Sequence, residues 1–162
     1  MHEVVDDQRA PPSEGVQAKK LIARQAIAAG MVVMEVEGGE IVAQPACYSI
    51  QCGAQQHMVI ATDARFYSHS VLRPNCAVKF GLASLSFVSI RDIQEGEDMT
   101  FDYCTTEWEM SCPFLDEETG EETQGFKFLS PARKRALLEA DHIAPHIMRL
   151  WLLDLAEGGS LG

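Results

Sequence analysis

Short apolar segments, each ending near a glycine or a proline, run through the first two thirds of the chain. The clearest strand candidates are 31–37, 40–43, 77–80, 85–90 and 99–103. They are β-branched or alternate between apolar and polar residues, and this period of two predicts strands. Gly81 separates two of them and indicates a hairpin or a pair of adjacent strands. Because helical periodicity is weak in this part, the sequence predicts a mostly β domain of short strands.

The pattern changes after Pro113. An acidic, turn-like stretch comes first, and Ser130-Pro131 then has the signature of a helix start, with a serine cap and a proline in the first turn. A second helix is expected to begin near Pro145. The expected division is a loose leader at 1–14, a core at 15–112, an acidic loop at 113–129 and a helical segment at 130–162.

The charge of the chain restricts its partners. The 162 residues suit one domain and carry a net charge of −11, which disfavours nonspecific binding to nucleic acid or to an anionic membrane. Half of the 24 acidic residues lie between Asp92 and Glu122, a range without lysine or arginine. A basic, lysine-containing protein or peptide is therefore an expected partner, although the part beyond Pro113 also fits a solvated loop.

Cysteine usage points to a reducing compartment. The chain has five cysteines, an odd number, without a Cys-x-x-Cys pair, and it begins without an apolar signal segment. With no run of about 18 apolar residues, we expect an intracellular protein, cytoplasmic or nuclear, with free thiols. His142 and His146 have the spacing of two metal ligands, but no third ligand is evident nearby, so we expect no metal.

Two motifs in the middle of the chain carry the candidate chemistry. Phe66-Tyr-Ser-His-Ser70 is followed by Arg73-Pro-Asn-Cys76, and the second motif runs from Ile90 to Tyr103. Taken singly, His69 has the pattern of a turn histidine and Tyr103 that of a residue at the core edge. A tyrosine at a strand end can also orient a nucleophile through its hydroxyl group.

In this order and spacing the motifs resemble the SET domain of protein-lysine methyltransferases. Ser68-His69-Ser70 with Pro74-Asn75 is similar to the family's Asn-His-Ser-Cys-x-Pro-Asn. Ile93-Gln-Glu-Gly-Glu-Asp-Met-Thr-Phe-Asp-Tyr103 resembles Ile-x-x-Gly-Glu-Glu-Leu-Thr-Phe-Asp-Tyr. Segments of 18–38 resemble the opening Gly-x-Gly and Glu-x-x-Gly elements, and the resemblance spans roughly residues 15–140.

The resemblance implies a knot-like β-clip of small sheets with a pseudoknot, followed here by C-terminal helices. It implies that S-adenosylmethionine binds on one side and reaches a lysine amine through a narrow channel. Tyr103 would be the catalytic tyrosine, and Phe101 would occupy the switch position in the substrate channel, where phenylalanine permits higher methylation states. The cofactor-binding residues that it implies are Ser68 and His69 at the adenine end, Lys20 and Leu21 in the opening segment, and Asn75, which would also support the knot.

Departures from the family pattern lie on the cofactor side. Ser68 stands for asparagine, Ala18 and Lys20 stand for the two glycines, and the cysteines of a post-SET zinc site are missing. Two functions therefore stay open. One is an S-adenosylmethionine-dependent protein-lysine methyltransferase, and the other is a repurposed SET fold that transforms a small molecule, for example by cyclisation, or binds a partner. A further reading makes Tyr103 and His69 core-edge residues of another β domain, and the helices around Trp151 could line the channel or form a homodimer face.

Overall fold

The computed structural model describes residues 1–8, 18–46 and 48–158. Its strands are short, as the sequence predicts: β1 (His2–Asp6), β2 (Lys19–Ala23), β3 (Val32–Glu37), β4 (Ile41–Val42), β5 (Ser49–Gly53), β6 (Gln56–Val59), β7 (Ser68–His69), β8 (Cys76–Phe80), β9 (Ser84–Ser89), β10 (Thr100–Phe101), β11 (Phe114–Leu115) and β12 (Glu122–Thr123). The helices are the 3-10 turns η1 (Asp63–Phe66), η2 (Tyr103–Thr105) and η3 (Phe126–Phe128), and the α-helices α1 (Pro131–Glu139) and α2 (Pro145–Ala156).

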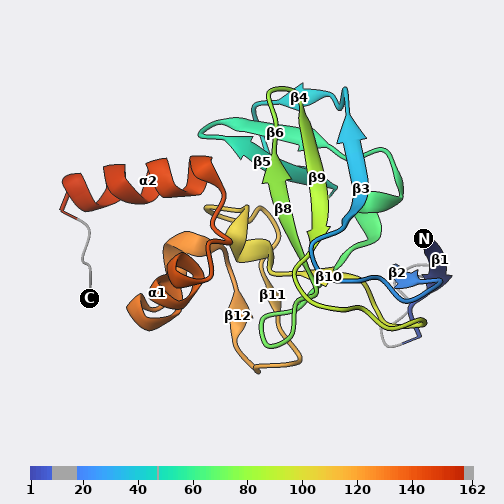
Figure 1. Ribbon diagram of the computed structural model, residues 1–162. Coiled ribbons are helices and arrows are strands. Elements are labelled where there is room, and N and C mark those ends of the chain that lie inside the picture. Colours follow the sequence, from blue (N-terminus) through green and yellow to red (C-terminus); the bar gives the residue numbers. More distant parts are fainter. Residues whose placement is uncertain (9–17, 47, 159–162) are drawn as a thin grey trace.

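The strands form small sheets. Two sheets have three strands, in the orders β3-β9-β8 and β4-β6-β5, and β1-β2, β7-β10 and β11-β12 are pairs. In Figure 1 the three-stranded sheets lie together at the top, the helices lie on the left and β1-β2 lies on the right. The expected fold class, a mostly β, SET-like arrangement of small sheets with C-terminal helices, is confirmed.

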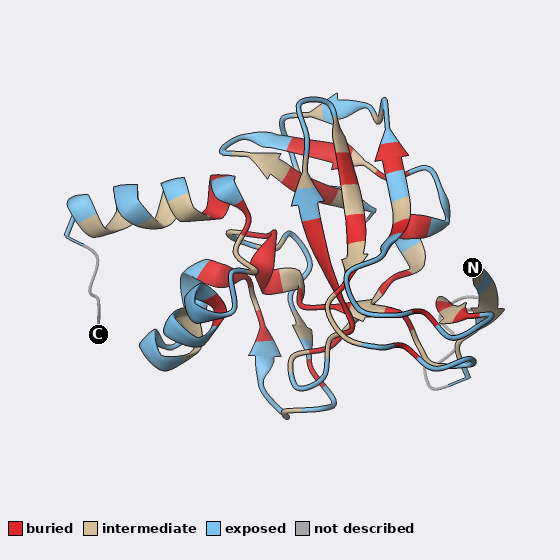
Figure 2. Ribbon diagram, in the orientation of Figure 1, coloured by how far each residue is buried: buried red, intermediate tan, exposed pale blue. Residues whose placement is uncertain are grey.

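The strand β9 shows how the sequence pattern produces the core. Its buried residues alternate with partly exposed ones, so that Leu85 and Phe87 point into the main core and are fully enclosed. The hairpin expected around Gly81 is present, since β8 pairs with β9 in antiparallel register and places Val78 opposite Phe87. Figure 2 shows the same alternation as red bands along the central strands.

Some expectations about local structure are wrong. The leader expected over 1–14 is not loose at residues 2–6, which form β1 and pair with β2 from His2↔Ala23 to Asp6↔Lys19. The apolar pair Val4 and Val5 allows this, because Val4 packs against the main core. Residues 9–14 of the expected leader lie outside the described residues. The strand expected over 99–103 is shorter, because the chain turns into η2 at Tyr103.

A parallel pair of two-residue strands brings the two sequence motifs together. Ser68 and His69 of β7 lie beside Thr100 and Phe101 of β10. Asn75 fixes the position of β10 in this pair. Its side chain is completely buried, donates to the Asp98 carbonyl at 2.7 Å and accepts from the Thr100 N–H at 2.8 Å. A buried amide that satisfies backbone groups on another segment holds that segment in register.

The C-terminal helices begin where the sequence predicts and form a second, smaller core. The Ser130 hydroxyl caps α1 by accepting from the Arg133 N–H at 3.2 Å. Phe126, Leu137, Ala144 and Ile147 are buried together, with Trp151 packed against them. Within the described part of the chain, no helix has both the length and the apolar character needed to cross a bilayer.

Candidate functional site

Tyr103 lies at the end of β10, where the strand turns into η2. Its hydroxyl donates to the Tyr67 carbonyl at 2.5 Å, which fixes the direction of the side chain. The ring lies in an aromatic cluster, with centroid distances of 4.9 Å to His69, 4.8 Å to Phe101 and 6.1 Å to Phe114. Burial and the nearby Glu107 carboxylate raise the pKa of the Tyr103 hydroxyl, so the group remains protonated at neutral pH.

The His69 ring contacts both the ring and the backbone N–H of Tyr103. The Tyr103 N–H donates to His69 Nδ1 at 3.1 Å, so a neutral ring carries its proton on Nε2. Burial lowers the pKa of His69, against the opposing effect of Asp102, Asp116 and Glu118. Its buried Nε2 has no hydrogen-bond partner among the described residues, and it is therefore a donor that a ligand could satisfy.

One cavity, the tyrosine cavity, opens beside Tyr103 and has a volume of about 260 Å³. Its walls are mostly apolar, and among its polar members are Tyr103 and Glu107. The lining residues are Pro45, Ala46, Tyr48, Ser49, Ile50, Ile60, Ala64, Arg65, Tyr67, Phe101, Tyr103, Thr106, Glu107, Met110, Ser111, Cys112 and Phe114. Such a narrow apolar pocket suits an aliphatic chain with a polar end.

A second, larger cavity, the histidine cavity, has a volume of about 1020 Å³ and lies beside Ser68 and His69. Its walls are polar and rich in carboxylates, with two arginines. The lining residues are Asp7, Ser68, His69, Ser70, Arg73, Arg91, Asp92, Gln94, Glu97, Asp98, Thr100, Phe114, Leu115, Asp116, Glu117 and Glu118. Phe114 lines both cavities, and its ring meets His69 edge-on at 5.4 Å.

The structure brings most of the expected site residues together. Phe101 and Tyr103 line the tyrosine cavity, and Ser68 and His69 line the histidine cavity. Lys20, Leu21 and Asn75 line neither cavity. Leu21 is fully buried in the main core, and Asn75 holds β10 beside β7. Lys20 directs its ammonium group to Asp98, at 2.7 Å, and is not among the residues that line either cavity.

The acidic residues between Asp92 and Glu122 line the histidine cavity more than the tyrosine cavity. Glu107 is the member that lines the tyrosine cavity, whereas the histidine cavity is lined by Asp92, Glu97, Asp98, Asp116, Glu117 and Glu118. Six of the twelve acidic residues between Asp92 and Glu122 thus line the cavity beside His69, together with Arg73 and Arg91. Docking of a basic peptide at this charge stays a prediction.

Glu118 holds the acidic hairpin against the loop that follows His69. Its carboxylate accepts from the Ser70 hydroxyl at 2.9 Å and from the N–H groups of Val71 and Leu72 at 3.1 and 3.3 Å. The hairpin β11-β12 thereby closes one side of the site, and Phe114 at its start reaches the aromatic cluster. This closure is made by hydrogen bonds of the Glu118 carboxylate.

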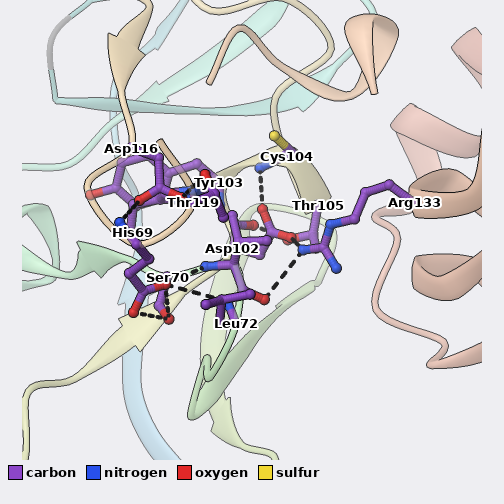
Figure 3. A network of polar contacts seen from close by, with 12 residues as sticks. His69, Ser70, Leu72, Asp102, Tyr103, Cys104, Thr105, Asp116, Thr119 and Arg133 are labelled. Atoms are coloured by element: carbon purple, nitrogen blue, oxygen red, sulfur yellow. Dashed lines mark hydrogen bonds and ion pairs between the residues drawn. The ribbon is translucent and has the colours of Figure 1, made fainter. Parts of the chain in front are cut away.

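A buried ion pair connects the site to the helices. Arg133 of α1 reaches Asp102, which is 3% exposed and also accepts from the Cys104 N–H at 3.0 Å (Figure 3). Burial raises the pKa of Asp102, and the Arg133 guanidinium opposes this effect. The helical segment makes further contacts with the same turn, since His146 Nε2 donates to the Thr106 carbonyl at 2.8 Å.

Sequence reasoning missed Glu107, Phe114, Glu118 and Arg133. Glu107 follows the tyrosine motif by four residues, and its nearness to Tyr103 in the sequence was the signal that could have found it. The others had no local signal, since their contacts are made with distant segments. Among the described residues, no group of three or more His, Cys, Asp or Glu is placed to hold a metal ion.

The chain was compared with known proteins. The model of the SET domain family matches residues 19–104. A proposed histone methyltransferase from Plasmodium falciparum superposes with a TM-score of 0.49 at 9% identity, over 64% of this chain and 96% of that chain. CpSET8 from Cryptosporidium superposes with a TM-score of 0.47 at 24% identity, over 63% of this chain and 56% of that chain. The search of curated proteins gave no match.

The range matched by the family model runs from β2 to η2 and contains both motifs, Ser68 to Asn75 and Ile93 to Tyr103. It covers more than half of the chain, and the described fold has the small sheets and the crossing of β7 and β10 that the motifs require. The chain belongs to the SET domain family, whose members are generally methyltransferases.

Proposed function

We propose that this chain is an S-adenosylmethionine-dependent methyltransferase that modifies the amine of a lysine side chain in a protein or peptide. The observation that carries the proposal is the position of Tyr103 in an aromatic cluster that separates two cavities of different chemistry. Transfer between two ligands requires that both reach one point while most of each stays apart. The cluster of His69, Tyr103 and Phe114 supplies such a point.

The chemistry of the histidine cavity supports the cofactor. S-adenosylmethionine carries a sulfonium and an ammonium group, which a carboxylate-rich wall attracts, and its carboxylate finds a counter-charge in Arg73. Ser68 and His69 would hold the cofactor, and His69 Nε2 offers an unpaired donor. When bound, the cofactor supplies an electrophilic methyl group.

The chemistry of the tyrosine cavity supports an amine acceptor. Its apolar walls fit the aliphatic stem of lysine. Because the Tyr103 hydroxyl donates its proton to the Tyr67 carbonyl, its oxygen remains an acceptor for an amine N–H. Tyr103 would therefore align the amine and stabilise the charge that develops on nitrogen. Its raised pKa keeps the hydroxyl protonated at neutral pH, so no tyrosinate is available to act as a base.

The alternative function, a repurposed SET fold, is less well supported. It would be favoured if the Lys20 side chain filled the cofactor cleft, but the Lys20 ammonium is paired with Asp98 and the cavity beside His69 is open. A small-molecule amine as acceptor is an outcome that the test below can detect.

The test begins with isothermal titration of the protein with S-adenosylmethionine. The proposal predicts binding, and no binding at millimolar cofactor would overturn it. Transfer of labelled methyl groups is then measured with poly-L-lysine and with n-butylamine as acceptors. Transfer to n-butylamine with none to poly-L-lysine would favour a small-molecule substrate, and transfer to neither would refute the methyltransferase proposal.

The variant Tyr103→Phe sharpens this test. It should lower the transfer rate roughly 10²-fold or more while cofactor affinity changes little, because the hydroxyl acts on the amine. Tyr48→Phe removes another hydroxyl from the wall of the same cavity and should cost far less. Equal losses in the two variants would contradict the role of Tyr103.

A further inference from the structure

A lysine amine enters a protein site as ammonium, since its ordinary pKa is about 10.4. It must lose a proton before its nitrogen can attack a methyl group. Tyr103 does not take this proton, because its own hydroxyl is protonated and bound to the Tyr67 carbonyl. The proposed function therefore needs a proton acceptor other than Tyr103.

Glu107 is the carboxylate in the lining of that cavity. It lies two residues after η2, and its backbone N–H donates to the Tyr103 carbonyl at 3.0 Å, so the two residues belong to one hydrogen-bonded turn. Its side-chain Oε1 accepts from the Gln51 N–H at 2.8 Å and from the Thr106 hydroxyl at 3.2 Å. Oε2 makes no hydrogen bond to a described residue, which leaves one oxygen available to a ligand.

The position of Glu107 is fixed by a reciprocal clamp with β5. Gln51 receives the Trp108 N–H on its side-chain Oε1 at 2.8 Å, while its own N–H binds Glu107. The Gln51 amide nitrogen donates to the Gly53 carbonyl at 2.9 Å and completes the anchoring. A carboxylate held this firmly presents its free oxygen in one direction, as a proton acceptor in a site requires.

Burial makes the Glu107 carboxylate a better proton acceptor. Burial raises the pKa of Glu107 to about 7, against the lowering effect of the bonds from Gln51 and Thr106. A group with this pKa is partly ionised at neutral pH and accepts a proton more readily than an exposed glutamate. Its 9% exposure and its lack of an ion-pair partner among the described residues leave a bound ammonium as the natural counter-charge.

Other titratable groups surround Glu107. They are Tyr48, Arg65, Tyr67, Tyr103 and Cys112 of the cavity lining, Cys52 on β5 and His57 on β6, opposite Gln51. Burial raises the pKa of Tyr67, Tyr103 and Cys52, and these three groups stay neutral near pH 7. Arg65 packs its guanidinium over the Phe66 ring at 4.7 Å. His57 is a weak base here because burial lowers its pKa.

We propose that Glu107 binds the substrate ammonium in the tyrosine cavity and accepts its proton, so that the neutral amine is generated next to Tyr103. This inference rests on the proposed function. In the step one N–H bond of the ammonium breaks, its electron pair stays on nitrogen, and the proton forms an O–H bond on Glu107. The carboxylic acid returns the proton to water when the methylated product leaves.

The first test does not depend on catalysis. The carboxyl carbon of Glu107 is followed by NMR in protein labelled with 13C-glutamate, with Glu107→Gln to assign the resonance. Adding n-butylammonium should lower the midpoint of its titration by about one pH unit, because a cation close to a carboxylate favours ionisation. An unchanged midpoint at 100 mM n-butylammonium, roughly the concentration needed for a weak ligand, would overturn the proposal.

The second test is the pH dependence of methyl transfer to poly-L-lysine. Glu107→Gln should be about 10²-fold slower than the wild type at pH 7.5, and the difference should narrow towards pH 10, where solution chemistry deprotonates the amine. A deficit that stays constant with pH would indicate a structural role and refute the proposal. The matched control is Glu109→Gln, an exposed acid that pairs with Lys127, which should keep the wild-type profile.

The two tests separate this inference from the proposed function. If n-butylammonium shifts the Glu107 titration while the wild type transfers no methyl group, the amine site stands and the methyltransferase proposal fails. If the wild type transfers methyl groups and Glu107→Gln equals it across the pH range, the inference fails alone.

Discussion

Removing the Arg133 side chain should destabilise the protein by leaving a buried charge unpaired. Asp102 lies between Phe101 and Tyr103, is 3% exposed, and keeps only its bond from the Cys104 N–H when the guanidinium is absent. Breaking a fully buried pair costs about 3–5 kcal/mol. Because the Arg133 side chain is 28% exposed, we expect the low end of that range for Arg133→Gln, about 3 kcal/mol at pH 8.

Thermal unfolding provides the assay. For a chain of this length, about 3 kcal/mol corresponds to a fall in Tm of roughly 6–12 °C. Without the guanidinium, the pKa of Asp102 in the folded protein rises further. Protonated Asp102 is then tolerated in the folded state, whereas ionising it costs stability, so the free energy of unfolding falls as the pH rises through that pKa. The defect should therefore be smaller at pH 5 than at pH 8, and the added change Asp102→Asn should recover part of it.

Two results would refute this reasoning. One is a Tm for Arg133→Gln within 2 °C of wild type at pH 8, which is roughly the effect of a surface substitution. The other is an equal loss for Arg135→Gln, which removes an exposed arginine from the same helix.

Three further predictions concern stability. The free energy of unfolding should fall by roughly 3 kcal/mol as the pH rises from about 4.5 to about 7, because Glu107 is protonated more readily in the folded state than in the unfolded state. Urea unfolding measured across this range should show the fall for the wild type and not for Glu107→Gln. Glu118→Gln should cost about 1–2 kcal/mol through its weakened contact with Ser70, and hydrogen exchange should show faster opening of the adjacent loop. Gly125→Ala should cost about 2 kcal/mol or more of stability, because φ is +116° and the added Cβ would lie 2.7 Å from the Trp108 carbonyl oxygen. Gly120→Ala, where the added Cβ meets open space, should cost about 1 kcal/mol, and thermal melts compare the two variants.

The sequence was informative wherever short-range patterns control the structure. The alternation in 85–90 and the cap at Ser130 predicted β9 and α1, because burial periodicity and free N–H groups depend on neighbouring residues. The strand β1 was missed because its pairing with β2 depends on a partner some seventeen residues away. The acid Asp6 and the polar stretch after it resemble a loop until that partner is known.

The sequence motifs predicted the central residues of the candidate site, but the residues around them were not predicted. His69, Phe101 and Tyr103 follow from residue order within one family pattern, and they lie together as expected. The role of Lys20 could not be read from its place in a glycine motif, since its contact with Asp98 joins segments 78 residues apart. Glu118 belongs to a similar class, because its carboxylate is held by N–H groups that any residue could supply.

Phe114 gives the two cavities a common wall, and this has a thermodynamic consequence. Any occupant of one cavity that shifts this ring changes the shape of the other, so the binding free energies of the two occupants are coupled. Linkage makes the coupling reciprocal: if the larger ligand tightens binding of the smaller one, the smaller one tightens binding of the larger by the same factor. A single aromatic side chain on a hairpin therefore suffices to make the binding of the two ligands cooperative, whichever of them binds first.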